Sequence, residues 1–229
     1  MNLPSVERLF KAKLDPAVVG FLHRPADPPH DALVLTHGAG ANCQASHLIE
    51  LAEAFAGAGF LVLRCDLPFR QQSPHGPPSF GAAERDREGL RRAVEVAGSL
   101  SPGRVFLGGH SYGGRQATML AASEPSLVEG LLLLSYPLHP PRKPDQLRTQ
   151  HFPNLNTPAL FVHGTRDPFG SESEIEQALD LIPAPTATLM IERAGHDLKT
   201  PKKAHDAMEV PLAFGIVGAF ELFFADQLR

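Results

Sequence analysis

Apolar residues fall into two kinds of segment along this chain: short continuous runs, and longer runs with helical spacing. The short runs predict strands near residues 18–23, 33–37, 60–65, 104–109, 129–135, 159–163 and 186–192. The longer runs predict helices near residues 46–58, 84–99, 113–123 and 171–181, and a final helix after Pro211. Strands that alternate with helices predict an α/β fold with a doubly wound, mostly parallel sheet flanked by helices.

Three segments show these patterns clearly. The run Leu131–Leu134 is continuously apolar, which is typical of a strand covered by helices on both faces. Two helical segments carry apolar stripes at helical spacing, which predict their buried faces. The first stripe is Leu90, Ala93, Val94, Ala97 and Leu100, and the stripe of the final helix is Leu212, Ile216, Ala219, Phe220 and Phe223.

A Gly-x-Ser-x-Gly pattern, Gly109-His110-Ser111-Tyr112-Gly113, joins the strand near 104–109 to the helix near 113–123. In a sharp strand-to-helix turn the serine is pushed out of the backbone, and the glycines two positions away must lack Cβ to avoid collision. The pattern therefore predicts Ser111 as a nucleophile, and a larger residue at Gly109 or Gly113 should disable the turn.

A serine hydroxyl needs a base within hydrogen-bond reach and a third group that orients the base. Asp167 follows the strand near 159–163, and His196 follows the strand near 186–192. In a parallel sheet the ends of these strands lie at one edge, so the three side chains are expected together. The chain order Ser111, Asp167, His196 is that of the α/β-hydrolase fold and differs from the orders in chymotrypsin-like and subtilisin-like proteases.

Two of these assignments have competitors. Asp167 has an alternative use as the cap of a helix that starts near Ser171. His196 has rivals in His163, which ends a strand and fits a hydrogen-bonded core residue, and in His205, which lies on a polar stretch.

The oxyanion of an acyl-transfer reaction needs backbone N–H donors. Tyr112 supplies one because it starts the helix after the nucleophile. Ala39 is predicted as the second, in a glycine-containing loop after the strand near 33–37, and His37 is interpreted as a structural residue of that loop. Arg70 and Arg115 are candidates to bind a substrate carboxylate, with a surface salt bridge as the alternative for Arg115.

These motifs resemble those of the α/β-hydrolase superfamily, from about residue 18 to the C-terminus. The matching segments are His37-Gly38-Ala39-Gly40, the pattern around Ser111, Gly164-Thr165-Arg166-Asp167 and Gly195-His196. The chain looks most like the small branch near dienelactone hydrolases, which implies a minimal fold without a cap domain. It has Ser111 where dienelactone hydrolases carry cysteine, so their substrate is not carried over.

The chain is also similar to a poorly characterised branch of predicted hydrolases that includes hydrolase-like modules of chromatin-associated regulatory proteins. The resemblance therefore carries two expectations. The first is a serine esterase that cleaves a small acyl compound, and the second is a binding or regulatory module with little or no turnover.

Composition predicts one domain over residues 1–229, since 43% of the residues are hydrophobic and no linker divides them. A net charge of -4 gives no electrostatic reason to expect nucleic acid or an anionic membrane as a partner. The first residues lack the pattern of a secretory signal, and the apolar segment 211–225 is too short to span a bilayer, so a cytoplasmic location is expected. The expected partner is a small-molecule acyl substrate, with no cofactor, and the oligomeric state is not predicted.

The two cysteines, Cys43 and Cys65, lack metal-ligand spacing, and a structural disulfide is not expected in a cytosolic protein. Cys43 is interpreted as a small buried residue, with a reactive thiol as the alternative. The segment Gly38–Cys43 together with Asp66 also imitates a dinucleotide-binding fingerprint. Cys43 stands where the third glycine of that fingerprint would pack, and the fingerprint leaves Ser111, Asp167 and His196 unexplained.

Two proline-rich loops, 67–80 and 137–144, are predicted at the same sheet edge as the candidate site. Proline fixes φ, so these loops should form fairly stiff walls. The second loop lies where larger α/β-hydrolases insert a lid, and here it is short. The sequence therefore predicts a small, open pocket that takes a modest ester in preference to a long lipid chain.

Overall fold

The protein is described by a computed structural model that covers residues 4–11, 13–200 and 211–226. Its strands form one eight-stranded sheet in the order β1-β2-β4-β3-β5-β6-β7-β8. The strands are β1 (Ser5–Lys11), β2 (Val18–Arg24), β3 (Asp31–Thr36), β4 (Phe60–Cys65), β5 (Val105–His110), β6 (Gly130–Leu134), β7 (Ala159–Gly164) and β8 (Thr186–Ile191). β2 pairs antiparallel with both β1 and β4, and the pairs from β4 to β8 are parallel, which confirms the predicted fold class.

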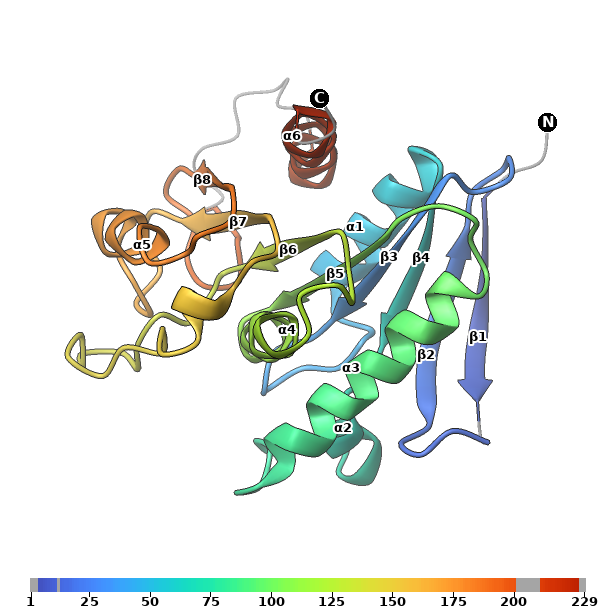
Figure 1. Cartoon of the computed structure of the whole chain (residues 1–229), viewed down its shortest axis with the longest axis horizontal. Coiled ribbons are helices and arrows are strands. Elements are labelled where there is room, and N and C mark those ends of the chain that lie inside the picture. Colours follow the sequence, from blue (N-terminus) through green and yellow to red (C-terminus); the bar gives the residue numbers. More distant parts are fainter. Residues whose placement is uncertain (1–3, 12, 201–210, 227–229) are drawn as a thin grey trace.

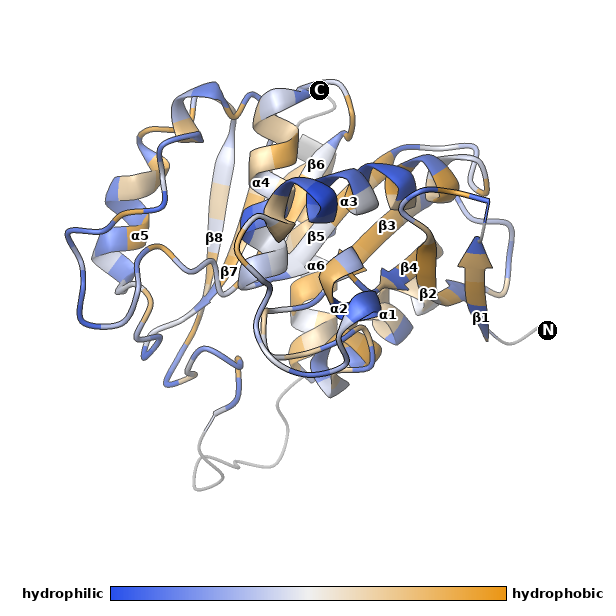
Figure 2. Cartoon of the chain, turned by 90° about the horizontal axis from the view of Figure 1, so that it is seen from below, coloured by the Kyte–Doolittle hydropathy of each residue, from blue (hydrophilic) through white to orange (hydrophobic). Residues whose placement is uncertain are grey.

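Helices cover both faces of the sheet (Figure 1). They are α1 (Ser46–Gly57), α2 (Pro68–Gln72), α3 (Ala82–Gly98), α4 (Tyr112–Ser123), α5 (Glu172–Leu179) and α6 (Leu212–Asp226), with a short 3-10 helix at Phe152–Asn154. Helices α1 and α6 share one apolar cluster with one sheet face, and α3, α4 and α5 share another with the opposite face. Figure 2 shows hydrophobic central strands beneath a largely hydrophilic α3.

The predicted strands and the longer predicted helices are all present, within a few residues at each end. β1 and α2 were not predicted. β1 is an edge strand and is mostly exposed, so its sequence carries no continuous apolar run. α2 has five residues, too few to show a helical period, although Pro68 at its first turn is a favourable start.

The buried face of α6 differs from the predicted stripe. Its fully buried residues are Ile216, Val217, Phe220 and Phe224, whereas Leu212 is exposed and Ala219 and Phe223 are only partly buried. The helix is apolar nearly all round, so hydrophobic spacing does not define a single face. No described helix combines the length and the apolar character that are needed to cross a membrane.

The parallel strands bring the candidate chemistry to one edge. β5 ends at His110, β7 ends at Gly164 and β8 ends at Ile191, and the loops that follow carry Ser111, Asp167 and His196. In doubly wound sheets this carboxyl edge is where ligands bind.

Candidate active site

Ser111 occupies the tight turn between β5 and α4. Its φ of 51° lies in the left-handed region, which is unusual for a residue with a side chain. Its backbone N–H donates to the carbonyl of Leu134 at 2.8 Å, which ties the turn to β6. A Cβ on Gly109 would lie 2.6 Å from the carbonyl carbon of Gly113, and a Cβ on Gly113 would lie 2.6 Å from the carbonyl oxygen of His37. Both glycines are thus required by close backbone contact, as the pattern predicts.

The structure brings the side chains of Ser111, His196 and Asp167 into one hydrogen-bonded series. The Oγ of Ser111 lies 2.8 Å from Nε2 of His196, and Nδ1 of His196 lies 2.7 Å from Oδ2 of Asp167. In a neutral imidazole, Nδ1–H donates to the carboxylate and Nε2 accepts from the serine hydroxyl. The Asp167 carboxyl is fully buried, while 22% of the His196 side chain remains exposed.

The Asp167 carboxylate is also fixed from its own loop, because Oδ1 accepts from the N–H of Phe169 at 2.9 Å. Asp167 does not cap α5. That cap is Ser171, which forms a capping box with Glu174, so the alternative use of Asp167 is wrong.

Two aromatic rings flank His196. The Phe169 ring stacks on the imidazole with centroids 4.2 Å apart, and the His110 ring lies 5.2 Å away. Nε2–H of His110 donates to the carbonyl oxygen of His196 at 2.8 Å. Burial lowers the pKa of His110 to about 4, so its ring is neutral at pH 7 and keeps this donor tautomer. Sequence reasoning missed this contact, since nothing in the pattern relates the residue before the nucleophile to the loop that carries His196.

The rival histidines differ in position. His163 is buried at the end of β7, where Nε2 donates to the carbonyl of Gly170 at 2.8 Å and Nδ1 lies 3.9 Å from the Asp167 carboxylate. This agrees with its interpretation as a hydrogen-bonded core residue. His205 lies outside the described residues.

The loop after β3 lies beside the nucleophile. A Cβ on Gly38 would come within 3.4 Å of the Ser111 Cβ and 3.0 Å of His110 Nδ1. Tyr112 is the first residue of α4, and its N–H is one of the helix-start donors without an intrahelical acceptor. Within the described part of the chain, neither this N–H nor that of Ala39 donates a hydrogen bond.

His37 holds this loop from within the core. The N–H of Leu67 donates to Nε2 of His37 at 3.1 Å, and Nδ1–H of His37 donates to the carbonyl of Gly38 at 2.9 Å. Burial lowers the pKa of His37, so the ring is neutral and carries both roles. The structural interpretation of His37 agrees with these contacts.

Arg70 of α2 also contacts the loop after β3. Its buried guanidinium donates to the carbonyl oxygens of Ala39 at 2.7 Å and Ala41 at 2.8 Å, and to those of Ser73 and Gly76 at 3.0 and 2.9 Å. Four of its five N–H groups are thus committed to backbone. These contacts favour a positioning role for Arg70 over the predicted contact with a substrate carboxylate.

Arg115 lies one turn after Ser111, and its backbone N–H donates to the Ser111 carbonyl at 3.0 Å. Burial lowers the pKa of Arg148, and the charge of Arg115 lowers it further. Among the ion pairs of the described residues, none involves Arg115. The surface salt bridge is therefore not seen, and carboxylate binding by Arg115 stays a prediction.

The competing interpretations of residues 38–43 and Asp66 do not fit the contacts. Asp66 Oδ1 accepts from the N–H of Cys43 at 2.7 Å, so the acidic group of the dinucleotide-like fingerprint is bound within the protein. Cys43 and Cys65 are free and buried. Burial raises the pKa of the Cys43 thiol to about 12, which favours the inert interpretation over a reactive thiol.

A family model described as "Alpha/beta hydrolase domain" matches residues 29–213, which is more than half of the chain. The chain belongs to this α/β-hydrolase family. The match contains the loop after β3, the nucleophile turn and the segments of Asp167 and His196. Family and fold together support a hydrolase, as the motifs predict.

Solved structures show the same fold at low sequence identity. A dienelactone hydrolase from Anabaena variabilis is 20% identical, with a TM-score of 0.72 and 98% of this chain and 99% of that chain covered. Est1E from Butyrivibrio proteoclasticus is 15% identical, with a TM-score of 0.73 and coverage of 96% and 99%. A serine hydrolase without lid from Xanthomonas campestris is 15% identical, with a TM-score of 0.66 and coverage of 99% and 96%.

Proposed function

We propose that this α/β-hydrolase is a serine esterase that cleaves a small ester through an acyl-enzyme intermediate. The observation that carries the proposal is the continuous series of hydrogen bonds from Ser111 Oγ through His196 to the buried Asp167 carboxylate. The bond between Ser111 Oγ and His196 Nε2 is already at proton-transfer distance in the resting protein. A buried, paired carboxylate beside an accessible imidazole is the arrangement that activates a serine.

In the proposed mechanism, Ser111 Oγ attacks the acyl carbonyl carbon as its proton passes to Nε2 of His196. Asp167 stabilises the imidazolium that forms and keeps its orientation. The N–H groups of Ala39 and Tyr112 bind the oxyanion. The bond from carbon to the leaving oxygen then breaks, and that oxygen receives the proton from His196. Water then attacks the carbonyl carbon of the acyl-enzyme as its proton passes to Nε2 of His196. The bond from that carbon to Ser111 Oγ breaks, Oγ receives the proton from His196, and the acid is released.

The test is hydrolysis of 4-nitrophenyl acetate by the purified protein. We expect Ser111→Ala and His196→Ala to lower the rate of ester hydrolysis close to the uncatalysed rate in buffer. Asp167→Asn should lower kcat about 10³-fold or more, because it stabilises the wrong tautomer of His196. Ser123→Ala, at the far end of α4, is the matched control with normal turnover. Circular dichroism checks that each variant is folded.

Unchanged turnover in folded Ser111→Ala would contradict the proposal. A folded wild-type protein that hydrolyses no ester of a broad panel would favour the binding module instead.

A further inference from the structure

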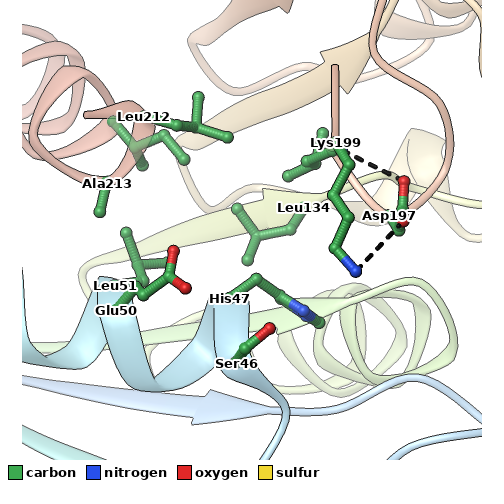
Figure 3. Close-up of a pocket in the computed structure, with 11 residues that line it drawn as sticks. Ser46, His47, Glu50, Leu51, Leu134, Asp197, Lys199, Leu212 and Ala213 are labelled. Atoms are coloured by element: carbon green, nitrogen blue, oxygen red, sulfur yellow. Dashed lines mark hydrogen bonds and ion pairs between the residues drawn. The ribbon is translucent and has the colours of Figure 1, made fainter. Parts of the chain in front are cut away.

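The carboxylate of Asp86 lies where α2, α3 and α4 meet on one face of the sheet (Figure 1). Asp86 belongs to α3, which packs against both α2 and α4, and its side chain is fully buried. The opposite face carries a cavity of about 220 Å³ between α1 and α6, and none of Ser111, Asp167 and His196 lines it (Figure 3). The contacts of Asp86, in contrast, reach the residue that directly follows the nucleophile.

The two oxygens of this carboxylate bind two different helices. Oδ2 accepts from the hydroxyl of Tyr112, the first residue of α4, at 2.8 Å. Oδ1 accepts at 2.9 Å from the N–H of Phe69 in α2, which is one of the helix-start donors without an intrahelical acceptor. The rings of Phe69 and Tyr112 also pack edge to face, with centroids 5.7 Å apart. Asp86 therefore fixes the start of α4 relative to α2.

The connection continues from α2 to the loop after β3. Arg70 directly follows Phe69 in α2, and its guanidinium donates to the carbonyl oxygen of Ala39 at 2.7 Å. Ala39 and Tyr112 carry the two proposed oxyanion donors. The contacts of α2 and of Asp86 thus join the residues that carry these donors, through buried hydrogen bonds at each step.

One side chain can hold both helices because an ionised carboxylate has two acceptor oxygens. Burial is the largest cause that acts on Asp86, and it raises the pKa of the carboxyl. The hydrogen bonds from Phe69 and Tyr112 act in the opposite direction, because they stabilise the ionised form. An apolar residue at this position would avoid the cost of burying a charge, but it would leave the Phe69 N–H without its acceptor. The carboxylate and its two donors are therefore coupled, and the loss of one weakens the hold on the others.

We infer that Asp86 is a positioning residue for the oxyanion site, because it holds α2 and α4 and thereby sets the separation of the Ala39 and Tyr112 N–H groups. This inference rests on the proposed esterase function. An oxyanion donor must lie about 2.7–3.1 Å from the oxygen that it stabilises, and a misplacement of about 1 Å costs up to about 10²-fold in rate. The oxyanion exists only after Ser111 has attacked, so the loss of Asp86 should weaken binding of the transition state and spare binding of the substrate.

The experiment measures hydrolysis and oxyanion binding separately in variants of the whole protein. Tyr112→Phe removes only the hydroxyl that binds Asp86, and Asp86→Leu removes the carboxylate. Each should lower kcat/KM for 4-nitrophenyl acetate about tenfold or more. Ser111 Oγ adds to the carbonyl carbon of a trifluoromethyl ketone, its proton passes to His196 and an oxyanion forms, so the Ki of this inhibitor should rise by the same factor. The methyl ketone of the same chain length hardly forms this adduct, and its Ki should change by less than about twofold.

A double variant and two controls separate positioning from a general loss of packing. If Asp86 acts through Tyr112, the variant with both substitutions should lose no more than about twofold beyond Asp86→Leu alone. Tyr136→Phe is the matched control, because Tyr136 is the only other tyrosine and its hydroxyl also donates a hydrogen bond, to a backbone carbonyl at 2.7 Å. Asp31→Leu removes a buried carboxylate that accepts from a backbone N–H at 2.7 Å, at the opposite edge of the sheet. Both controls should keep wild-type kinetics, whatever stability they lose.

Circular dichroism checks that each variant is folded, and Tyr112→Phe, which removes a single oxygen atom, decides the matter if Asp86→Leu does not fold. Wild-type kcat/KM in the folded variants, or an equal rise in Ki for both ketones, overturns the positioning role alone. An additive loss in the double variant has the same meaning. Folded wild-type protein that hydrolyses no ester overturns the proposed function, and this inference with it.

Discussion

Ser111 is placed by its neighbours as much as by the pattern in which it stands. Gly113 lies against the backbone of the loop after β3, so the nucleophile and the proposed oxyanion donors are held at a fixed separation. A side chain at Gly113 would push the two apart.

We expect Gly113→Ala to lower the free energy of unfolding by about 1–3 kcal/mol, since its Cβ would lie 2.6 Å from both the His37 carbonyl oxygen and the Thr36 methyl group. The same substitution should abolish ester hydrolysis, because it moves the nucleophile away from the proposed oxyanion donors. Gly218→Ala is the control: its Cβ meets nothing within 4 Å on α6, and it should stabilise by about 0.5–1 kcal/mol. Denaturant unfolding measures both, and a Gly113→Ala protein as stable and active as wild type would refute this account.

Arg70 is expected to position the loop that carries Ala39 and not to bind substrate. Arg70→Met removes four donors to loop carbonyls, so kcat/KM should fall about 10- to 100-fold for neutral and anionic esters alike. A residue that binds a substrate carboxylate behaves differently, because its loss affects anionic esters only. Kinetics on a matched neutral and anionic pair distinguish the two, and a loss confined to the anionic ester would restore the substrate-binding role.

The helices and strands that could be predicted from the sequence are those that a local pattern of residues defines. Continuous apolar runs predicted the strands of the sheet interior, and glycine spacing predicted the turn at Ser111. β1 was not predicted because its residues are mostly exposed. The buried face of α6 was misassigned because that helix has almost no polar side. Tertiary packing creates the hydrogen bond from His110 to the His196 carbonyl and those from Arg70 to the loop after β3. No local spacing in the sequence encodes these contacts.

Helix α6 packs on the sheet through Phe220. Phe220 is buried and contacts the rings of Phe55, Phe60, Phe106 and Phe224. Phe220→Ala should therefore cost about 3–5 kcal/mol of unfolding free energy. Leu222, two residues on, is 68% exposed, and Leu222→Ala should change stability by less than about 0.5 kcal/mol. Similar losses in both variants would show that α6 packs through a different face.

For the whole molecule, buried histidines predict loss of stability in acid. Burial is the largest cause that lowers the pKa values of His23, His110 and His151 to about 4, from an ordinary value near 6.5. Between these values the unfolded chain binds protons that the folded protein does not, so stability falls as pH decreases from about 6.5 to about 4.

Denaturant unfolding across this pH range measures the effect as a slope. His23→Gln removes one of the titrating groups. Near pH 5.5 it should reduce the slope of the unfolding free energy against pH by the amount that corresponds to about one bound proton. Ser123→Ala removes no titrating group, so it serves as the control and should leave the slope as in wild type. An unfolding free energy that is constant from pH 7 to pH 4.5 would contradict the burial of these rings in neutral form.

An activated serine reacts with a fluorophosphonate, so labelling followed by mass spectrometry shows whether Ser111 is the nucleophile. We expect one adduct on Ser111 in the folded wild-type protein, much slower labelling of Asp167→Asn, normal labelling of Ser123→Ala and none of Ser111→Ala. Folded wild-type protein that stays unlabelled, or that carries its adduct on another residue, would contradict it.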